Sequence, residues 1–208
     1  MLYEVKYAAL LQYSPRGNSV ISVKSRKIRD QIKGGRIAPL GRSIVDIINE
    51  NNEGLKEFLN NEVTLVPVPR SSPIRESDLW PAYEVAKLLA SAKMGAISTC
   101  LYRSYPIKKS SLFYKAEERP SIKDQYDSMG VKNTVPSNDI TLVDDVITIG
   151  RTSVAAACRI SEKFPNATIR VLSMIRTMSF VPDIDSIRNV IVGTITYNSG
   201  SGKCRREP

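Results

Sequence analysis

The stretch ITLVDDVITIGRTS, residues 140 to 153, joins two adjacent carboxylates to a turn of glycine and hydroxyl residues. Asp144 and Asp145 follow an apolar run, as they would near the end of a buried strand. Two apolar residues later comes a short turn, which consists of Thr148, Ile149, Gly150, Arg151, Thr152 and Ser153. Such a turn at the start of a helix presents unpaired backbone N–H groups and the positive end of the helix dipole, so it predicts a phosphate site.

The residue types in this stretch suit a phosphorylated sugar. Gly150 allows a close approach of the backbone, and the hydroxyl groups of the turn can donate hydrogen bonds. Asp144 and Asp145 can accept hydrogen bonds from the vicinal hydroxyls of a ribose whose 5′-phosphate lies in the turn. They also favour Mg²⁺, a hard ion that prefers oxygen ligands. The structural alternative is that Thr152 or Ser153 only caps the helix and that the aspartates belong to a turn.

The overall charge also favours anionic partners. The 208 residues include 30 Lys and Arg against 21 Asp and Glu, a net charge of +9, and no histidine. A positive field attracts phosphorylated small molecules and nucleic acids alike. The absence of histidine excludes Ser-His-Asp hydrolysis and every His-ligated metal site, so any chemistry must rely on carboxylates, Lys, Arg, hydroxyls and backbone amides.

Cysteine usage and hydropathy predict a cytoplasmic protein with reduced thiols and no membrane contact. Cys100, Cys158 and Cys204 are odd in number and far apart, which indicates neither a disulfide framework nor a zinc cluster. No apolar run approaches the roughly 18 residues that a membrane span needs. The first residues also lack the pattern of a secretory signal.

Strands and helices alternate from residue 63 onward. We expect strands at 63–68, 96–102, from 140, 168–174 and 189–197, and helices at 80–94 and 152–164. Near-continuous apolar strands are typical of a parallel sheet covered on both faces, so the predicted fold class is α/β, with a doubly wound, mainly parallel sheet. The polar loops after Val68 and Val143 would lie at the carboxyl edge of this sheet, where ligands bind in such folds.

The chain divides into three predicted parts. Residues 1–62 contain a strand over 2–13 and helical regions at 20–33 and 42–61, and they are a candidate hood or partner-docking region. Residues 63–197 form the predicted core. Residues 198–208 are expected to be a basic, flexible tail.

The 140–153 stretch resembles the phosphoribosyl-pyrophosphate (PRPP) motif of type I phosphoribosyltransferases: apolar residues, two acids, two apolar residues, then Thr-x-Gly-x-Thr/Ser. Ile149 stands where many members have Thr. The segment VTLVPVPRSSP followed by WPAYEVAKLLA is similar to the pyrophosphate-loop strand and first helix of ComF-like, amidophosphoribosyltransferase-related proteins, without the Asn-Gln pair of that helix. KAEERPSIKDQY looks like their Arg-rich segment, with Ser121 in place of Asn. The resemblance covers about residues 63 to 177.

The resemblance implies a type I phosphoribosyltransferase fold that binds PRPP with Mg²⁺ and transfers ribose 5-phosphate to a nitrogen acceptor, or hydrolyses PRPP. It assigns Asp144 and Asp145 to the ribose and Mg²⁺. It also assigns Arg70, Ser71 and Ser72 to the pyrophosphate loop, and Lys108, Lys109, Lys115 and Arg119 to a mobile loop that closes over it. One alternative is a PRPP or nucleotide sensor that uses the same site without catalysis. For the cations the alternative is a solvated basic loop.

A second alternative is a nucleic-acid-associated module on the same fold, since ComF-like proteins are linked to DNA uptake or defence. Residues 24–42 are rich in cations: Lys24, Arg26, Lys27, Arg29, Lys33, Arg36 and Arg42. The tail adds Lys203, Arg205 and Arg206. A solvated basic face, a docking surface for a protein partner, or a homo-oligomer contact would explain the same residues. The sequence does not identify the acceptor.

Overall fold

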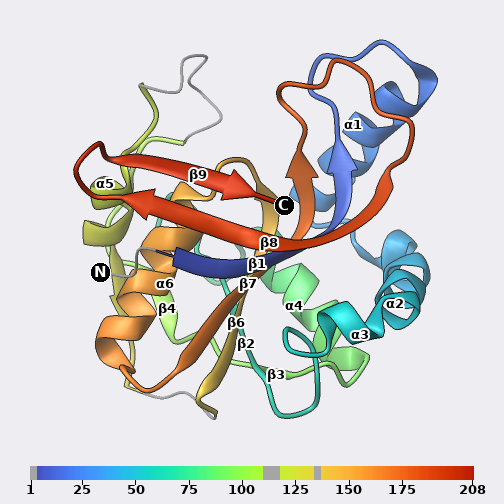
Figure 1. Ribbon diagram of the computed structural model, residues 1–208. Helices are drawn as coiled ribbons and strands as arrows, with labels where there is room; N and C mark the ends of the chain where they lie inside the picture. Colours follow the sequence, from blue (N-terminus) through green and yellow to red (C-terminus); the bar gives the residue numbers. More distant parts are fainter. Residues whose placement is uncertain (1–3, 110–117, 134–136) are drawn as a thin grey trace.

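The computed structural model describes residues 4–109, 118–133 and 137–208. In this part of the chain a seven-stranded sheet has the order β3-β2-β6-β7-β1-β8-β9 (Figure 1). Its strands are β1 Glu4–Tyr13, β2 Thr64–Pro67, β3 Ala96–Ile97, β6 Asp139–Ile147, β7 Thr168–Thr177, β8 Arg188–Asn198 and β9 Lys203–Glu207. Strands β3, β2, β6, β7 and β1 run parallel, whereas β8 is antiparallel to both of its neighbours. The prediction of an α/β fold with a mainly parallel sheet is confirmed.

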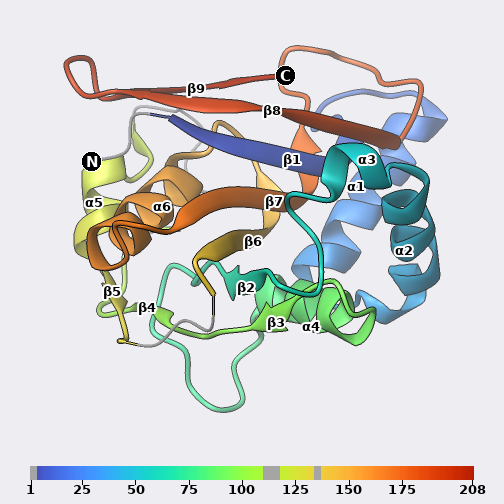
Figure 2. The same ribbon diagram turned by 60° about the horizontal axis from the view of Figure 1, so that its bottom comes forward.

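Helices cover both faces of the sheet. They are α1 Val20–Lys33, the 3₁₀ turn η1 Ala38–Leu40, α2 Gly41–Glu50, α3 Asn52–Leu55, α4 Pro81–Ser91, α5 Ile122–Asp127 and α6 Arg151–Lys163. Figure 2 shows α5 and α6 on one side of the sheet and α1, α2 and α4 on the other. A small second sheet, β4 Leu101–Arg103 with β5 Met129–Val131, lies on the α6 side, because Leu101 and Met129 belong to the same apolar cluster as α6.

Two apolar clusters, one on each face, hold these layers together. On the α6 face, Val154 to Ala157 and Ile160 pack against Ile140, Leu142 and Val171 of the sheet. The run of small residues in α6 lets this helix approach the strands closely. On the other face, α2 and α4 contribute Ile44, Ile47, Val85 and Leu89, which pack over Leu10 and Val143. The sheet is thus buried on both faces, as near-continuous apolar strands require.

The chain reverses its direction of travel across the sheet between β2 and β6. From β2 the chain crosses through α4 to β3 on one side, whereas from β6 it crosses through α6 to β7 on the other. The loops that follow β2 and β6 therefore diverge, and they leave a crevice at the carboxyl ends of these neighbouring strands. This is the position at which open α/β sheets bind ligands.

The strand expected over 2–13 is confirmed as β1, which pairs with β7 and β8, so the first 62 residues contribute a strand to the main sheet. Two other expectations from the sequence need correction. The stretch 96–102 splits into β3 and the start of β4, which belong to different sheets. The tail also contains a strand, because Lys203–Glu207 pairs with β8 as β9. Each difference results from pairing between residues that lie far apart in the sequence or across a turn.

Two further features concern the described residues. None of their helices combines the length and the apolar character that crossing a membrane requires. Cys100, Cys158 and Cys204 form no disulfide with one another in this part of the chain.

Candidate functional site

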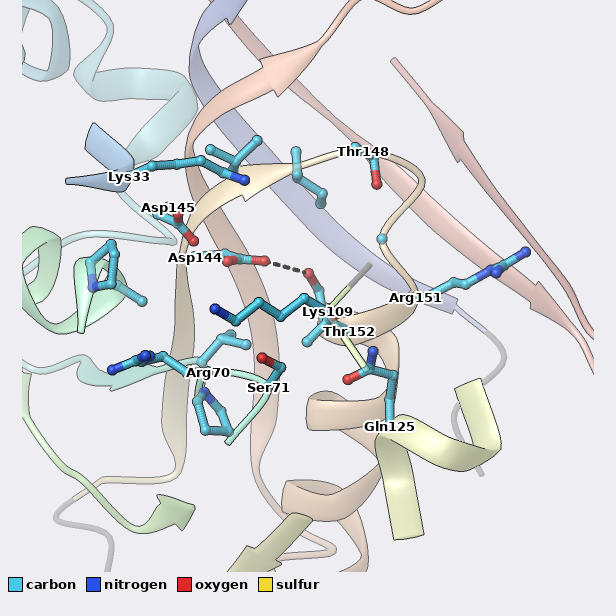
Figure 3. A pocket seen from close by; sticks show the side chains of 18 of the residues that line it. Lys33, Arg70, Ser71, Lys109, Gln125, Asp144, Asp145, Thr148, Arg151 and Thr152 are labelled. Atoms are coloured by element: carbon cyan, nitrogen blue, oxygen red, sulfur yellow. Dashed lines mark hydrogen bonds between the residues drawn. The ribbon is translucent and has the colours of Figure 1, made fainter. Parts of the chain in front are cut away.

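A cavity of about 540 Å³ opens at the carboxyl ends of β2 and β6 (Figure 3). We call it the carboxyl-edge pocket. The loop after β2, the end of β6, the first turn of α6 and the face of α1 all contribute to its lining. Its volume is within the range of about 300–1,000 Å³ that is usual for small-molecule sites.

Asp144 and Asp145 lie at the centre of the pocket. Both belong to β6, three and two residues before its last residue, and both line the cavity. Asp144 is 8% exposed and accepts a hydrogen bond from Ser153 Oγ at 3.2 Å, so it faces α6. Asp145 lies on the side of α1, where Lys33 is the charged group that acts most strongly on it (Figure 3).

The two carboxylates hold their protons more tightly than ordinary aspartates do. Burial raises the pKa of Asp144 well above its usual value, and repulsion from Asp145 raises it further. Burial also raises the pKa of Asp145, whereas the positive charge of Lys33 opposes that rise. Without a cation between them the pair therefore resists full ionisation, and an incoming positive ion would relieve the repulsion.

Residues 148–153, which we call the phosphate turn, connect β6 to α6. Gly150 is the N-cap of α6 and has φ +89°, a left-handed conformation that favours glycine. A Cβ at this position would lie 2.8 Å from atoms of the Ile195 side chain. Since no side chain caps α6 and Ser153 instead bonds Asp144, the capping role considered for Thr152 and Ser153 is not observed. The first residues of this 13-residue helix line the pocket, so the positive end of the helix dipole favours an anionic ligand there.

The loop after β2 forms the opposite wall. Arg70 and Ser71 line the pocket, and Arg70 lies 3.6 Å from Asp78 in an ion pair. The backbone oxygen of Ser71 accepts a hydrogen bond from the N–H of Ile107 at 2.7 Å, which ties this loop to the segment that carries Lys108 and Lys109. Ser72 is half-buried but is not among the residues that line the pocket.

Further cations line the pocket. Lys108, Lys109 and Arg119 line the pocket together with Arg151, and Arg151 Nη1 lies 3.4 Å from the backbone oxygen of Arg119 as its donor. Lys115 lies outside the described residues.

Arg103 is a buried cation that the sequence did not single out. It is 4% exposed, and its Nε donates to the backbone oxygen of Arg70 at 2.7 Å. Its terminal nitrogens donate to the backbone and side-chain oxygens of Gln125, both at 3.1 Å. Burial lowers the pKa of Arg103 to about 10, so the side chain stays positively charged at neutral pH. It holds the loop at Arg70 in place and adds positive potential beneath the pocket.

The cation-rich segment 24–42 is divided between the pocket and the surface. Arg29 and Lys33 line the pocket, whereas Lys24 and Lys27 are exposed on the other side of α1. Arg26 donates hydrogen bonds to the backbone oxygens of Ser14 and Gly17, so it stabilises the β1–α1 connection. The spacing of Ser22, Ser25, Arg29 and Lys33 could have identified the inward face, because residues three and four apart share one side of a helix.

The lining is strongly positive. Eight of the lining residues are lysine or arginine, and two are acidic; the cations are Arg29, Lys33, Arg70, Arg103, Lys108, Lys109, Arg119 and Arg151. Cations converging on a concave surface concentrate the positive potential there. The pocket is therefore suited to a ligand with several negative charges and with hydroxyl groups that can reach the aspartates.

Mg²⁺ fits the two aspartates if a ligand brings further oxygen atoms. Within residues 4–109, 118–133 and 137–208 no cluster of three or more histidine, cysteine, aspartate or glutamate side chains could hold a metal ion. Mg²⁺ usually takes one or two carboxylates, keeps several waters and completes its shell with substrate phosphates. Burial and the neighbouring Asp145 raise the pKa of Asp144, and a bound cation would lower it. The residues present thus fit a Mg²⁺ ion that arrives with a phosphorylated ligand.

Comparisons with known proteins add no family to this description. No protein-family model matches the chain, and a search of curated proteins finds no match either.

Proposed function

We propose that this protein has a type I phosphoribosyltransferase fold and binds PRPP with Mg²⁺ in the carboxyl-edge pocket. It would transfer the ribose-5-phosphate group to a nitrogen acceptor or hydrolyse PRPP. One observation carries the proposal: the phosphate turn, the aspartate pair and the loop at Arg70 all line a single cavity at the switch point of the sheet.

Each part of PRPP has a matching part of the pocket. The 5′-phosphate would bind the backbone N–H groups of the phosphate turn, helped by the dipole of α6. The ribose hydroxyls would donate to Asp144 and Asp145, which are acceptors when ionised. The pyrophosphate would lie against Arg70, Lys109 and Arg119, which add positive charge to the lining of the pocket.

The same arrangement would favour group transfer. The bond between ribose C1 and the pyrophosphate oxygen breaks, and the pyrophosphate leaves with the bonding electron pair. The acceptor nitrogen, or the oxygen of water in hydrolysis, forms the new bond to C1 with its lone pair and releases a proton to solvent. Fixed cations at Arg70 and Lys109 stabilise the charge that accumulates on this leaving group. Mg²⁺, when bound, neutralises part of the same charge. Asp144 and Asp145 orient the ribose, and their negative charge favours the positive charge that develops on the sugar.

Thermal unfolding with PRPP and Mg²⁺ tests the proposal. At about 100 times its dissociation constant a ligand adds about 2.7 kcal/mol to the free energy of unfolding. We expect this gain for the wild type and for Asp46→Asn, since Asp46 is exposed on α2 outside the pocket. The double variant Asp144→Asn/Asp145→Asn should show little gain. An equal gain in the double variant would show that PRPP binds elsewhere.

A regulatory protein that only senses PRPP would use the same residues. Release of pyrophosphate over time separates the two possibilities, because a sensor binds PRPP without consuming it. Slow, Asp144-dependent release from PRPP and Mg²⁺ alone would indicate hydrolysis. Release that needs an added nitrogen compound would indicate transfer.

A nucleic-acid-associated function remains the second proposal. Fewer cations of residues 24–42 are available to nucleic acid than the sequence suggested. Arg29 and Lys33 line the pocket, and Arg26 donates hydrogen bonds to backbone oxygens. Lys24, Lys27, Arg36 and Arg42 are still exposed. If they bind phosphates of DNA, the affinity should fall by orders of magnitude between about 50 and 200 mM salt. Changing all four to glutamine should then abolish DNA binding and leave PRPP binding intact.

A further inference from the structure

Two cations in the pocket lie apart from those that we assign to the phosphates of PRPP. Arg70, Lys109, Arg119 and Arg151 come from the loop after β2, the segment after β4 and the start of α6. Arg29 and Lys33 instead come from α1, which covers the other face of the sheet. In Figure 3, Lys33 lies on one side of the aspartates, and Arg70, Ser71 and Lys109 lie on the other.

We propose that Arg29 and Lys33 bind a negatively charged group, a carboxylate or a phosphate, on the nitrogen acceptor. The inference rests on the proposed function, because it treats the space between α1 and Asp145 as the acceptor side of a PRPP site. It specifies the class of acceptor: a nitrogen compound that carries an anionic group.

Contact with Tyr13 orients the guanidinium of Arg29 before an anionic group binds. Its guanidinium lies over the ring of Tyr13, with 5.1 Å from Cζ to the ring centroid, and its side chain is 25% exposed. Stacking on an aromatic ring fixes the plane of the guanidinium, whose paired N–H groups match carboxylate and phosphate oxygens. The Arg29 side chain therefore loses little conformational entropy when an anionic group binds.

Arg29 also forms an ion pair within α1. Its Nε lies 2.8 Å from Asp30 Oδ1, and the Asp30 side chain is 61% exposed, so this pair contributes little to stability. An anionic ligand would bind the two terminal nitrogens of the guanidinium.

Lys33 supports the same assignment from the next turn of α1. It lies four residues after Arg29, so both side chains share the face that lines the pocket. None of the ion pairs formed within the described residues involves Lys33. Lys33 could instead have only a structural role, in which its charge offsets the negative charge of Asp145 and of the C-terminal end of α1. In that case, loss of Lys33 would not change which acceptor binds.

Calorimetry on the full chain with matched acceptor pairs tests the inference. Each pair differs only in the anionic group: 2-aminobenzoate against aniline, and O-phosphoethanolamine against ethanolamine. The protein is first saturated with ribose 5-phosphate, which fills the phosphate turn but has no pyrophosphate to lose. We expect one anionic compound to bind at least tenfold more tightly than its neutral partner, and the pair that responds identifies the anion.

Variants assign the preference to α1. Arg29→Gln/Lys33→Gln should remove it, whereas Lys24→Gln/Lys27→Gln, on the exposed side of the same helix, should retain it. Arg29→Lys keeps the positive charge but lacks the planar guanidinium, so this variant should retain part of the preference for the anionic compound. Affinity for PRPP with Mg²⁺ should fall less than affinity for the anionic acceptor in Arg29→Gln/Lys33→Gln, and thermal unfolding shows that each variant has folded.

Several results would overturn the inference. They are an equal or absent response to both members of each pair, a preference that survives in Arg29→Gln/Lys33→Gln, or a loss of PRPP affinity in that variant as large as the loss of acceptor affinity. Failure of the wild type to bind PRPP would instead overturn the proposed function, and the inference with it.

Discussion

At the scale of single residues, the site carries an electrostatic cost that the fold tolerates. Asp144 and Asp145 are neighbours on one strand, and burial raises the pKa of both. Structures retain such costs at functional sites, where a ligand or ion removes them. Replacing one carboxylate should consequently stabilise the protein alone while impairing its ligand binding.

The first prediction concerns Asp144→Asn. The folded state holds the Asp144 proton more tightly than the unfolded chain, whose pKa is about 3.9, so wild-type stability falls as pH rises above that value. The amide cannot ionise, so the variant should be more stable than the wild type at pH 7. The advantage should disappear near pH 3, where the wild-type carboxyl is protonated in both states. Thermal unfolding across this pH range would contradict the account if the variant were less stable at pH 7.

The second prediction concerns Arg103→Lys. A lysine keeps the charge but cannot replace the hydrogen bonds from one guanidinium to Arg70 and Gln125. The free energy of unfolding should fall by about 2–4 kcal/mol, and PRPP affinity should fall because the loop at Arg70 loses its anchor. The control is Arg75→Lys, an exposed position that should change stability by less than about 0.5 kcal/mol. Denaturant unfolding measures both, and equal values would show that Arg103 does not anchor the loop.

At the scale of elements, the connection from β6 to α6 sets the geometry of the site. The strand places the aspartates near the carboxyl edge, and Gly150 in a left-handed conformation turns the chain directly into α6. This keeps the N-terminus of the helix beside the carboxylates. The backbone of the turn therefore matters more than the side chain of Ile149.

The third prediction concerns Gly150→Ala. The alanine would have an unfavourable φ of +89° and a Cβ 2.8 Å from atoms of Ile195, so stability should fall by about 1–3 kcal/mol. Affinity for ribose 5-phosphate should fall at least tenfold, because the N–H groups of the turn move. Gly54→Ala, in α3, is the control: its Cβ would lie 3.9 Å from the Val192 side chain, and stability should be unchanged or slightly higher. Thermal unfolding and calorimetry compare the two, and similar behaviour of both variants would contradict this account of the turn.

The elements around the site were largely predictable from the sequence. Apolar runs, Gly150 and the alternation of strands and helices identify β2, α4, β6, α6 and β7, because these depend on local patterns. The place of β1 between β7 and β8 depends on pairing with residues over 160 positions away, which no local pattern reveals. Arg103 was missed as a pocket residue for the same reason, since only the tertiary fold brings it to Arg70 and Gln125. For Arg29 and Lys33, helical spacing indicates the inward face of α1 but not the pocket that this face lines.

At the scale of the whole molecule, the C-terminal hairpin of β8 and β9 stabilises the strands that carry the site. Arg206 of β9 donates hydrogen bonds to the backbone oxygens of Ile147 and Thr177, at 3.3 and 3.0 Å. These residues end β6 and β7, so the last residues of the chain brace the strand from which the phosphate turn departs. The predicted flexible tail gave no indication of this role, because charged, glycine-containing segments are usually solvated.

The fourth prediction concerns Arg206→Gln. Loss of both hydrogen bonds from a partly buried guanidinium should lower the free energy of unfolding by about 1–3 kcal/mol and weaken binding of ribose 5-phosphate. Arg205→Gln is a matched control on the same strand, since its side chain is 80% exposed and its ion pair with Glu207 is superficial. Thermal unfolding should rank the wild type and Arg205→Gln together above Arg206→Gln. If all three unfolded alike, β9 would not support the site.

The central claim is that the carboxyl-edge pocket binds PRPP together with Mg²⁺. Calorimetric titration of the wild type with PRPP, in the presence and absence of Mg²⁺, tests it most directly. We predict one PRPP per chain and at least tenfold tighter binding with Mg²⁺, because the ion relieves the repulsion between Asp144 and Asp145. Absence of binding in both conditions would contradict the account. A weak affinity that does not change with Mg²⁺ and is lost at high salt would also contradict it, because the pocket would then act only as a basic surface.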